Sequence, residues 1–150
     1  MLKKILIGAG VLAVAGVAYV RLSPTDLTAF HVAPMATEAG DTATAASFKA
    51  ARQITTPAAD ILRAIDQIAR ETERTERVAG SVGEGLVTYE TRSALMGYPD
   101  YTTVTVTDGA EGPLLVINAR SRFGKGDMGV NRARVEDWLT RLGPLVVSAT

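Results

Sequence analysis

Short glycine-containing turns join the alternating apolar stretches in the second half of this chain. The stretches expected to be strands begin near Glu73 and then cover residues 86–93, 101–107 and 114–120. Turn residues lie between them, as in Gly83-Glu84-Gly85 and in the run from Asp108 to Pro113. Parallel strands need a crossover connection of a dozen or more residues. Connections this short therefore predict an antiparallel meander of four strands.

One amphipathic helix is expected before these strands and another after them. Thr56 and Pro57 suit the cap and the first turn of a helix with apolar residues at three-to-four spacing. These apolar residues are Ile61, Leu62, Ile65, Ile68 and Ala69. The second helix begins near Asn131 and ends at Gly143-Pro144. Its apolar face carries Val135, Trp138, Leu139 and Leu142. This order predicts an α+β fold in which two helices cover one face of the four-stranded antiparallel meander.

The amino terminus carries an unbroken apolar run from Ile5 to Val20, with Lys3 and Lys4 before it and Arg21 after it. A helix of this length reaches about 24 Å, slightly less than a hydrocarbon core of about 30 Å, and snorkelling lysines extend it. We expect residues 1–21 to form an uncleaved signal anchor, a single N-terminal transmembrane helix. A cleaved signal peptide is the alternative, because residues 13–15 and 16–18 resemble cleavage sites. A buried core helix is a further alternative.

The charges that flank the apolar run set the expected orientation. Lys3 and Lys4 favour a cytoplasmic amino terminus under the positive-inside rule, whereas Arg21 stands alone on the other side. The folded domain is therefore expected outside the cytoplasmic (inner) membrane, in the periplasm of a Gram-negative cell. The chain has no cysteine, which excludes disulfides and thiol chemistry and suits either compartment.

Composition divides the chain into four parts. After the anchor, residues 22–55 contain Pro24, Pro34 and Gly40 and show no sustained hydrophobic period, so we expect an extended linker. The α+β domain is expected to span residues 56–143, and residues 144–150 form a tail. His31, the only histidine, lies in the expected linker and is interpreted as a solvated or packing residue.

Alternation along the strands fixes which side chains share a face of the sheet. The face that the helices cover is expected to carry Val87, Tyr89, Leu115, Ile117 and Ala119. The opposite, open face then carries Glu90, Arg92, Thr103, Thr105, Asn118, Arg120 and Arg122. Arginines that frame a threonine stripe suit a phosphate or carboxylate group, which guanidinium groups bind with paired donors. The alternative is an ordinary polar face with weak, exposed ion pairs.

A glycine-rich loop, part of the sequence SRFGKGDMGVNRAR, joins the last expected strand to the last helix. Gly124, Gly126 and Gly129 are expected to shape this loop, because glycine adopts backbone angles that other residues rarely reach. The start of a helix favours anions, and Lys125 and Arg132 lie close to it in the sequence.

Two polar residues of the same loop are expected to hold it in place. Asp127 is interpreted as bonding backbone amides or pairing with Arg132 or Arg92. Asn131 is expected to cap the helix, which occupies its side chain with backbone amides.

Two stretches of the chain resemble the bacterial domain-of-unknown-function family 1499. The first is this loop, whose matching positions are Ser121, Arg122, Gly124, Asp127, Gly129, Val130, Asn131 and Arg132. The second lies earlier, and its matching positions are Thr91, Arg92, Ser93, Gly97 and Asp100. The resemblance covers the chain from about Thr56 to Leu142. Many relatives carry a cysteine near the start of the domain, which this chain lacks. The family has no established activity, so the resemblance implies a domain boundary and a site but no function.

No motif in the chain predicts a particular reaction. Gly124-Lys125-Gly126 lacks the spacing of a Walker A motif, and there is no dinucleotide fingerprint. With one histidine and no cysteine, neither a metal site nor a cofactor is expected. The formal net charge is zero, which argues against a nucleic-acid partner. Asp100 and Asp127 are the two loop carboxylates that a hydrolase-like enzyme would use for acid–base work.

These observations favour a membrane-anchored extracytoplasmic binding or accessory domain over an enzyme, and no catalytic residue is assigned. Its expected ligand is an anionic lipid or another envelope component that bears phosphate or carboxylate. The expected ligand-binding residues are Arg92, Arg120, Arg122, Lys125, Asp127, Asn131 and Arg132. Two alternatives stay open: the hydrolase-like enzyme, and an accessory subunit that docks on a larger membrane complex through the same face.

Overall fold

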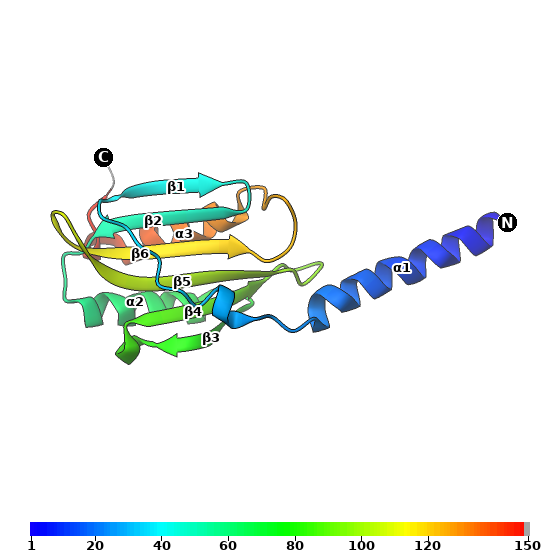
Figure 1. Ribbon diagram of the computed structural model, residues 1–150, viewed down its shortest axis with the longest axis horizontal. Helices are drawn as coiled ribbons and strands as arrows, with labels where there is room; N and C mark the ends of the chain where they lie inside the picture. Colours follow the sequence, from blue (N-terminus) through cyan, green and yellow to red (C-terminus); the bar gives the residue numbers. More distant parts are fainter. Residues whose placement is uncertain (149–150) are drawn as a thin grey trace.

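Six antiparallel strands form one sheet in the spatial order β1-β2-β6-β5-β4-β3 (Figure 1). The computed structural model describes residues 1–148. The strands are β1 (Gly40–Thr44), β2 (Ser47–Gln53), β3 (Thr75–Ser81), β4 (Leu86–Arg92), β5 (Pro99–Gly109) and β6 (Gly112–Ser121). The helices are α1 (Leu2–Leu22), α2 (Ala58–Glu71) and α3 (Val130–Leu142), with short 3-10 helices η1 (Leu27–Ala29), η2 (Val82–Glu84) and η3 (Gly143–Leu145). These elements confirm the predicted α+β class. Residues 149–150 of the predicted tail lie outside the described residues.

The predicted four-stranded meander is wrong in its number of strands, because the sheet has six. Strands β3 to β6 form the predicted meander, with each pair of neighbours antiparallel. Strands β1 and β2 form a hairpin from residues 40–53, a range that we expected to be part of an extended linker. Strand β2 pairs along its whole length with β6. The most apolar strand, β6, therefore has a hydrogen-bonded neighbour on both sides.

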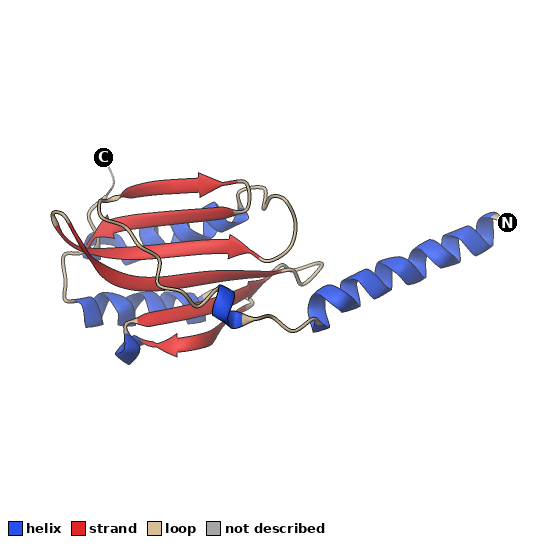
Figure 2. Ribbon diagram, viewed as in Figure 1, coloured by secondary structure: helices blue, strands red, loops and turns tan. Residues whose placement is uncertain are grey.

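Helices α2 and α3 lie behind one face of the sheet and run roughly along the strands, as Figure 2 shows. The core between the two layers takes from the sheet Phe48, Ala50, Val87, Tyr89, Val104, Leu115, Ile117 and Ala119. From the helices it takes Ile61, Leu62, Ile65, Ile68, Ala69, Val135, Trp138 and Leu142. The predicted covered face is therefore confirmed, because residues two apart on a strand point to the same side.

Helix α1 projects away from the sheet at the end of the molecule where the loops β4–β5 and β6–α3 lie (Figure 1). Its 21 residues give a length of about 32 Å, enough to cross a hydrocarbon core of about 30 Å. Residues 3–16 are exposed, and partial burial begins only at Val17. The predicted N-terminal apolar helix is thus confirmed. Its length and composition are those of a helix that could cross a membrane, and a signal sequence near the amino terminus meets the same criteria.

The segment that follows α1, residues 23–39, crosses the face of the sheet opposite α2 and α3 (Figure 1). We call these residues the strap. The ring of Phe30 lies 4.3 Å from that of Tyr101, measured between centroids. His31 Nδ1 is 2.9 Å from Thr88 Oγ1, and Thr103 Oγ1 donates to the carbonyl of Phe30 at 2.8 Å. The strap therefore covers part of the face that we expected to be open.

Candidate functional site

The strand register gathers several of the predicted site residues on the strap-covered face. Glu90 on β4 faces Tyr101 on β5, which in turn faces Arg120 on β6. Two residues further along β5, Thr103 lies between Thr88 on β4 and Asn118 on β6. The predicted set of side chains on this face is therefore brought together by strand pairing.

Arg120 is bound to the strap. Its Nη2 donates to the carbonyl of Phe30 at 2.6 Å and its Nη1 to that of Ala29 at 3.2 Å. The guanidinium carbon lies 5.0 Å from the centroid of the Phe30 ring. Nε is buried and has no acceptor among the described residues. Burial of the guanidinium lowers the pKa of Arg120 from its ordinary value.

Arg122 holds the start of the strap in a similar way. Its Nη1 donates to the carbonyl of Ser23 at 2.8 Å and to Thr25 Oγ1 at 2.7 Å. Its Nη2 donates to Ser23 Oγ at 3.0 Å and to the carbonyl of Pro24 at 2.8 Å. Because these strap oxygens accept from both terminal nitrogens of Arg122, those donors are not available to an anionic ligand. Ligand binding by Arg120 and Arg122 stays a prediction, and in the present arrangement their donors stabilise the strap.

Arg92 lies at the edge of this face and is less enclosed. Its Nε donates to Glu90 Oε1 at 2.6 Å and its Nη1 to the carbonyl of Gly97 at 3.2 Å. Glu90 also accepts from the Tyr101 hydroxyl at 2.7 Å. Burial is the main reason that the pKa of Tyr101 is raised. About a third of the Arg92 side chain, 36%, stays exposed, so a solute can reach it.

The β6–α3 loop is organised by Asp127. Its carboxylate oxygens accept the backbone N–H groups of Gly129 at 2.9 Å and Asn131 at 3.0 Å, at the start of α3. Burial of the carboxylate acts to raise its pKa, but these amide bonds outweigh it and lower the pKa below the ordinary value. The residue thus bonds backbone amides, one of the two roles we expected. Gly124 and Gly129 have φ angles of +91° and +81°, in the left-handed region.

Asn131 does not cap α3, because its side chain is directed into the domain. It is fully buried, and its Nδ2 donates to Ser121 Oγ at 2.9 Å. Its Oδ1 accepts from Arg134 Nη1 at 2.9 Å. Arg134 also pairs with Asp100 at 3.1 Å, and Asp100 accepts from Ser121 Oγ at 2.7 Å. The four residues form a closed polar network that joins β5, β6 and α3.

The two carboxylates of the hydrolase hypothesis are therefore engaged in different structural contacts. Asp100 is paired with Arg134 inside the network, and Asp127 bonds the first amides of α3. His31 bonds Thr88 on the strap-covered face. Among residues 1–148 there is no group of three or more histidine, aspartate or glutamate residues placed to hold a metal. The geometry favours structural roles for these groups, and the hydrolase hypothesis gains no support from it.

Lys125 and Arg132 are not gathered with Arg92. Lys125 is exposed in the β6–α3 loop. Arg132 pairs with Glu136 at 2.8 Å, and its guanidinium carbon lies 5.2 Å from the centroid of the Phe48 ring on β2. Strand β2 is separated from β4, which carries Arg92, by β6 and β5. The predicted site residues therefore fall into separate groups.

Instead, three arginines meet in a hollow of about 470 Å³ at the end of β4 nearest α1. We call it the arginine hollow. Its lining is Arg21, Arg74, Glu76, Glu90, Arg92, Ser93, Ala94 and Gly97. Arg74, just before β3, donates from Nε to the carbonyl of Arg92 at 3.2 Å, and Arg21 lies in the last turn of α1. Of the three arginines, sequence reasoning identified only Arg92. The positions of Arg21 and Arg74 depend on long-range contacts for which the sequence carries no local signal.

The polar network, the β6–α3 loop and the arginine hollow use most of the positions that carried the resemblance noted above. The family model described as "Protein of unknown function (DUF1499)" matches residues 23–142. The chain belongs to this family. The match begins at the first residue of the strap, residue 23, and so extends further toward the amino terminus than the resemblance that begins at about Thr56. No curated protein matches the chain.

Proposed function

We propose that this DUF1499 chain is a single-pass membrane protein whose α+β domain lies on the extracytoplasmic side and binds an anionic group. The group is a phosphate or a carboxylate, and its site is the arginine hollow. The observation that carries the proposal is the convergence of Arg21, Arg74 and Arg92 from three separate parts of the chain on one hollow.

The flanks of α1 support the proposed location. Lys3 and Lys4 lie at its amino-terminal end, and positive charge near a span favours the cytoplasmic side. The described domain follows its carboxyl-terminal end, where Arg21 is the one basic residue of the last turn. A helix that crosses a membrane in this orientation leaves the arginine hollow at the outer surface.

The hollow is lined by three arginines and by the two carboxylates of Glu76 and Glu90, so its formal charge favours an anion by one positive charge. Arg92 is paired with Glu90 and Arg74 with the exposed Glu73. Arg21 instead donates to two backbone carbonyls, those of Met96 at 3.4 Å and Leu95 at 3.2 Å. Among the described residues, no carboxylate lies within 4.0 Å of its guanidinium, which thus keeps an unneutralised charge. Hydrogen bonds from guanidinium groups to phosphate or carboxylate are among the strong ones in proteins.

The proposal is tested by calorimetric titration of the full-length protein in a neutral detergent with inorganic phosphate and with glycerol phosphate. The test variant is Arg74→Gln/Arg92→Gln, which keeps polar side chains but removes two charges. Each charge-assisted hydrogen bond contributes about 1.5 to 3 kcal/mol, so we expect the dissociation constant to rise at least ~tenfold.

Arg63→Gln is the matched control, because Arg63 lies on the exposed side of α2 and pairs only with Asp60 among the described residues. We expect this variant to bind as the unaltered protein does. Thermal unfolding of all three proteins checks that the variants are folded. If the unaltered protein does not bind either anion, or if the double variant binds as well as the control, the arginine hollow is not the site.

A further inference from the structure

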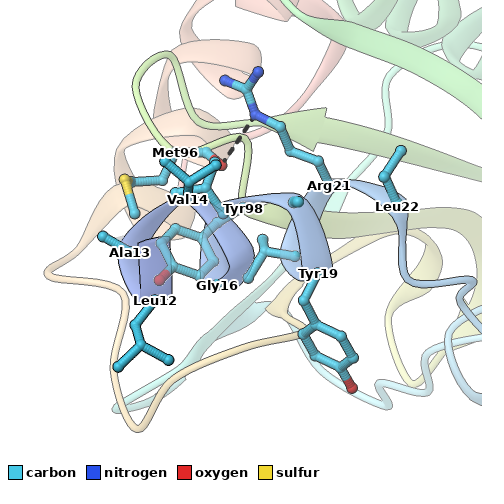
Figure 3. Close-up of a pocket in the computed structure, with 12 residues that line it drawn as sticks. Leu12, Ala13, Val14, Gly16, Tyr19, Arg21, Leu22, Met96 and Tyr98 are labelled. Atoms are coloured by element: carbon cyan, nitrogen blue, oxygen red, sulfur yellow. Dashed lines mark hydrogen bonds between the residues drawn. The ribbon is translucent and has the colours of Figure 1, made fainter. Parts of the chain in front are cut away.

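A long apolar groove lies beside the arginine hollow. It has a volume of about 880 Å³ and runs along the outer half of α1, under the β4–β5 loop (Figure 3). Its lining is Leu12, Ala13, Val14, Gly16, Val17, Ala18, Tyr19, Val20, Arg21, Leu22, Met96 and Tyr98. We call it the anchor groove. Except for Arg21 and the tyrosine hydroxyls, its side chains are apolar, so it suits a hydrocarbon group.

Arg21 connects the anchor groove to the arginine hollow, because it lines both. The β4–β5 loop also takes part in both, with Met96 and Tyr98 on the groove side and Ser93 on the hollow side. Figure 3 shows the bond from Arg21 to the carbonyl of Met96 at this junction. An apolar site and a cationic site with one shared arginine match the two ends of an amphiphile.

The aromatic residues at this end of the domain indicate a membrane interface. The Phe123 ring lies 6.3 Å from that of Tyr19 and 6.2 Å from that of Tyr98, between centroids. Tyrosine is enriched where a protein meets lipid headgroups. Leu95, at the tip of the same β4–β5 loop, is 84% exposed. A large exposed apolar side chain beside a membrane helix is expected where the loop touches the bilayer.

The depth of the two sites fits a lipid molecule. From Leu12 to Arg21 the helix rises about 14 Å, roughly half of a hydrocarbon core of about 30 Å. If α1 spans the membrane, the anchor groove lies in the outer leaflet and the arginine hollow at the level of the headgroups. The acyl chain and the headgroup of a lipid occupy these same two depths in a bilayer.

We propose that the ligand is an anionic phospholipid, with its phosphate in the arginine hollow and an acyl chain in the anchor groove. This inference rests on the proposed function, which concerns the hollow alone. It adds that the anchor is part of the binding site, and that an acyl chain contributes to the affinity and restricts the ligand to lipids.

Two glycines of α1, Gly16 and Gly8, allow the proposed role of the groove to be tested. Gly16 lines it, and an added Cβ there meets nothing within 4 Å, so Gly16→Leu fills space in the groove without a clash at Cβ. Gly8 also has open space around an added Cβ but is not among the lining residues. Gly8→Leu is therefore the matched control, since it makes the same chemical change in the same helix.

The measurement is native mass spectrometry of the full-length protein in neutral detergent micelles with phosphatidylglycerol, phosphatidylcholine or glycerol phosphate. We expect phosphatidylglycerol to be retained at least ~tenfold better than either of the others. We expect Gly16→Leu and Arg74→Gln/Arg92→Gln each to reduce that retention at least ~tenfold, and Gly8→Leu to leave it unchanged.

Other results overturn the inference in distinguishable ways. If Gly16→Leu retains the lipid while the arginine variant loses it, or if glycerol phosphate binds as well as the lipid, the groove proposal fails and the proposed function stands. If both lipids are retained equally and the arginine variant changes nothing, the lipid is bound by apolar contact alone and both proposals fail. A protein isolated from its own membrane without residues 1–18 also overturns the inference, because its groove is then missing.

Discussion

The guanidinium of Arg122 and the main chain and side chain of Ser23 are joined by two hydrogen bonds, across 99 positions of the sequence. Ser23 directly follows α1, and Arg122 directly follows β6. The contact therefore fixes where the apolar helix leaves the domain. The same contact lies at the start of the strap. Further along, hydrogen bonds of Arg120, Thr103 and Thr88 hold the strap over the sheet. The orientation of the domain relative to α1 depends on this junction.

Replacing Arg122 by alanine is expected to loosen the strap. The variant leaves two backbone carbonyls and two hydroxyls without their donor, and we expect the free energy of unfolding to fall by about 1.5 to 3 kcal/mol. Hydrogen exchange of the full-length protein should speed up in residues 23–31 before it changes elsewhere. Arg122→Lys keeps the charge but loses the fork of donors, so an intermediate effect is expected. Unchanged exchange in the strap would show that Arg122 does not stabilise it.

Strands β3 to β6 were predictable because their sequence has both alternation and turn residues. In β4 and β6 inward positions such as Tyr89 and Ile117 are large and apolar, and Gly85 and Gly112 mark turns. The hairpin of β1 and β2 lacks both signals. Its two-residue turn is Ala45-Ala46 rather than an asparagine–glycine type, and several of its strand residues are alanine or threonine. Small residues such as Ala50 are sufficient in these strands because neighbouring elements fill the space around them. No local sequence pattern indicates this packing.

The candidate site was predictable only in part, for a similar reason. Strand alternation correctly placed Arg120 on the face opposite the helices, but it gave no sign that the strap would cover that face. Prediction of the Arg21 position requires knowing that Gly97 and its loop reach the end of α1. A Cβ on Gly97 would lie 2.9 Å from Arg21 Nε, which shows how closely the loop and the helix approach. Such contacts follow from the assembled sheet rather than from sequence spacing.

Asp127 is expected to stabilise the domain in a pH-dependent way. Its pKa is lowered in the folded state, so its contribution is present above about pH 3.9, the ordinary value, and is lost as the pH falls through the folded value. Asp127→Asn keeps one acceptor but loses the charge that favours the start of a helix. We expect it to cost about 1 kcal/mol at neutral pH, measured by urea unfolding.

The comparison over pH separates this role from a general packing effect. The difference in unfolding free energy between Asp127→Asn and the unaltered protein should narrow as the pH falls from neutral toward about pH 2, because protonation of Asp127 removes the charge that distinguishes the two side chains. A difference that stays constant down to that pH would contradict the assignment of a charge-dependent helix-start role to Asp127.

Gly80 and Gly85 form a matched pair that tests how closely β4 and the strap pack against Gly80. Both have φ angles in the left-handed region, +71° and +73°, so alanine is strained at both. At Gly80 an added Cβ would also lie 2.0 Å from the Leu86 carbonyl oxygen and 2.7 Å from His31 Cε1. At Gly85 it would meet nothing within 4 Å.

We therefore expect Gly85→Ala to cost about 1 kcal/mol and Gly80→Ala to cost more than twice as much, in thermal or urea unfolding. Gly80→Ala should also raise hydrogen exchange around His31, because the strap must move to make room. Equal losses in the two variants would mean that backbone strain alone acts at Gly80 and that neither the Leu86 carbonyl nor the strap packs closely there.

The buried hydroxyl of Tyr89 is expected to make the stability of the domain depend on pH. Its hydroxyl donates to Asp66 Oδ1 at 2.8 Å, and burial, followed by this hydrogen bond, raises its pKa well above the ordinary value. The unfolded chain ionises its tyrosines near about pH 10, while the folded domain keeps Tyr89 neutral. Its contribution to stability is therefore complete below about pH 10 and is lost as the pH rises from there toward the folded value.

Tyr89→Phe is expected to cost about 1 to 3 kcal/mol at neutral pH, because the Asp66 carboxylate, which is 8% exposed, loses a donor. Arg77 and Arg70, at 3.7 and 3.9 Å, limit that loss. Between about pH 9 and pH 11 the unaltered protein should lose stability more steeply than the variant, since only the former carries this hydroxyl. Urea unfolding at the two pH values measures both slopes. Parallel slopes would mean that the Tyr89 hydroxyl ionises as readily in the folded domain as in the unfolded chain, and that the bond to Asp66 does not form in solution.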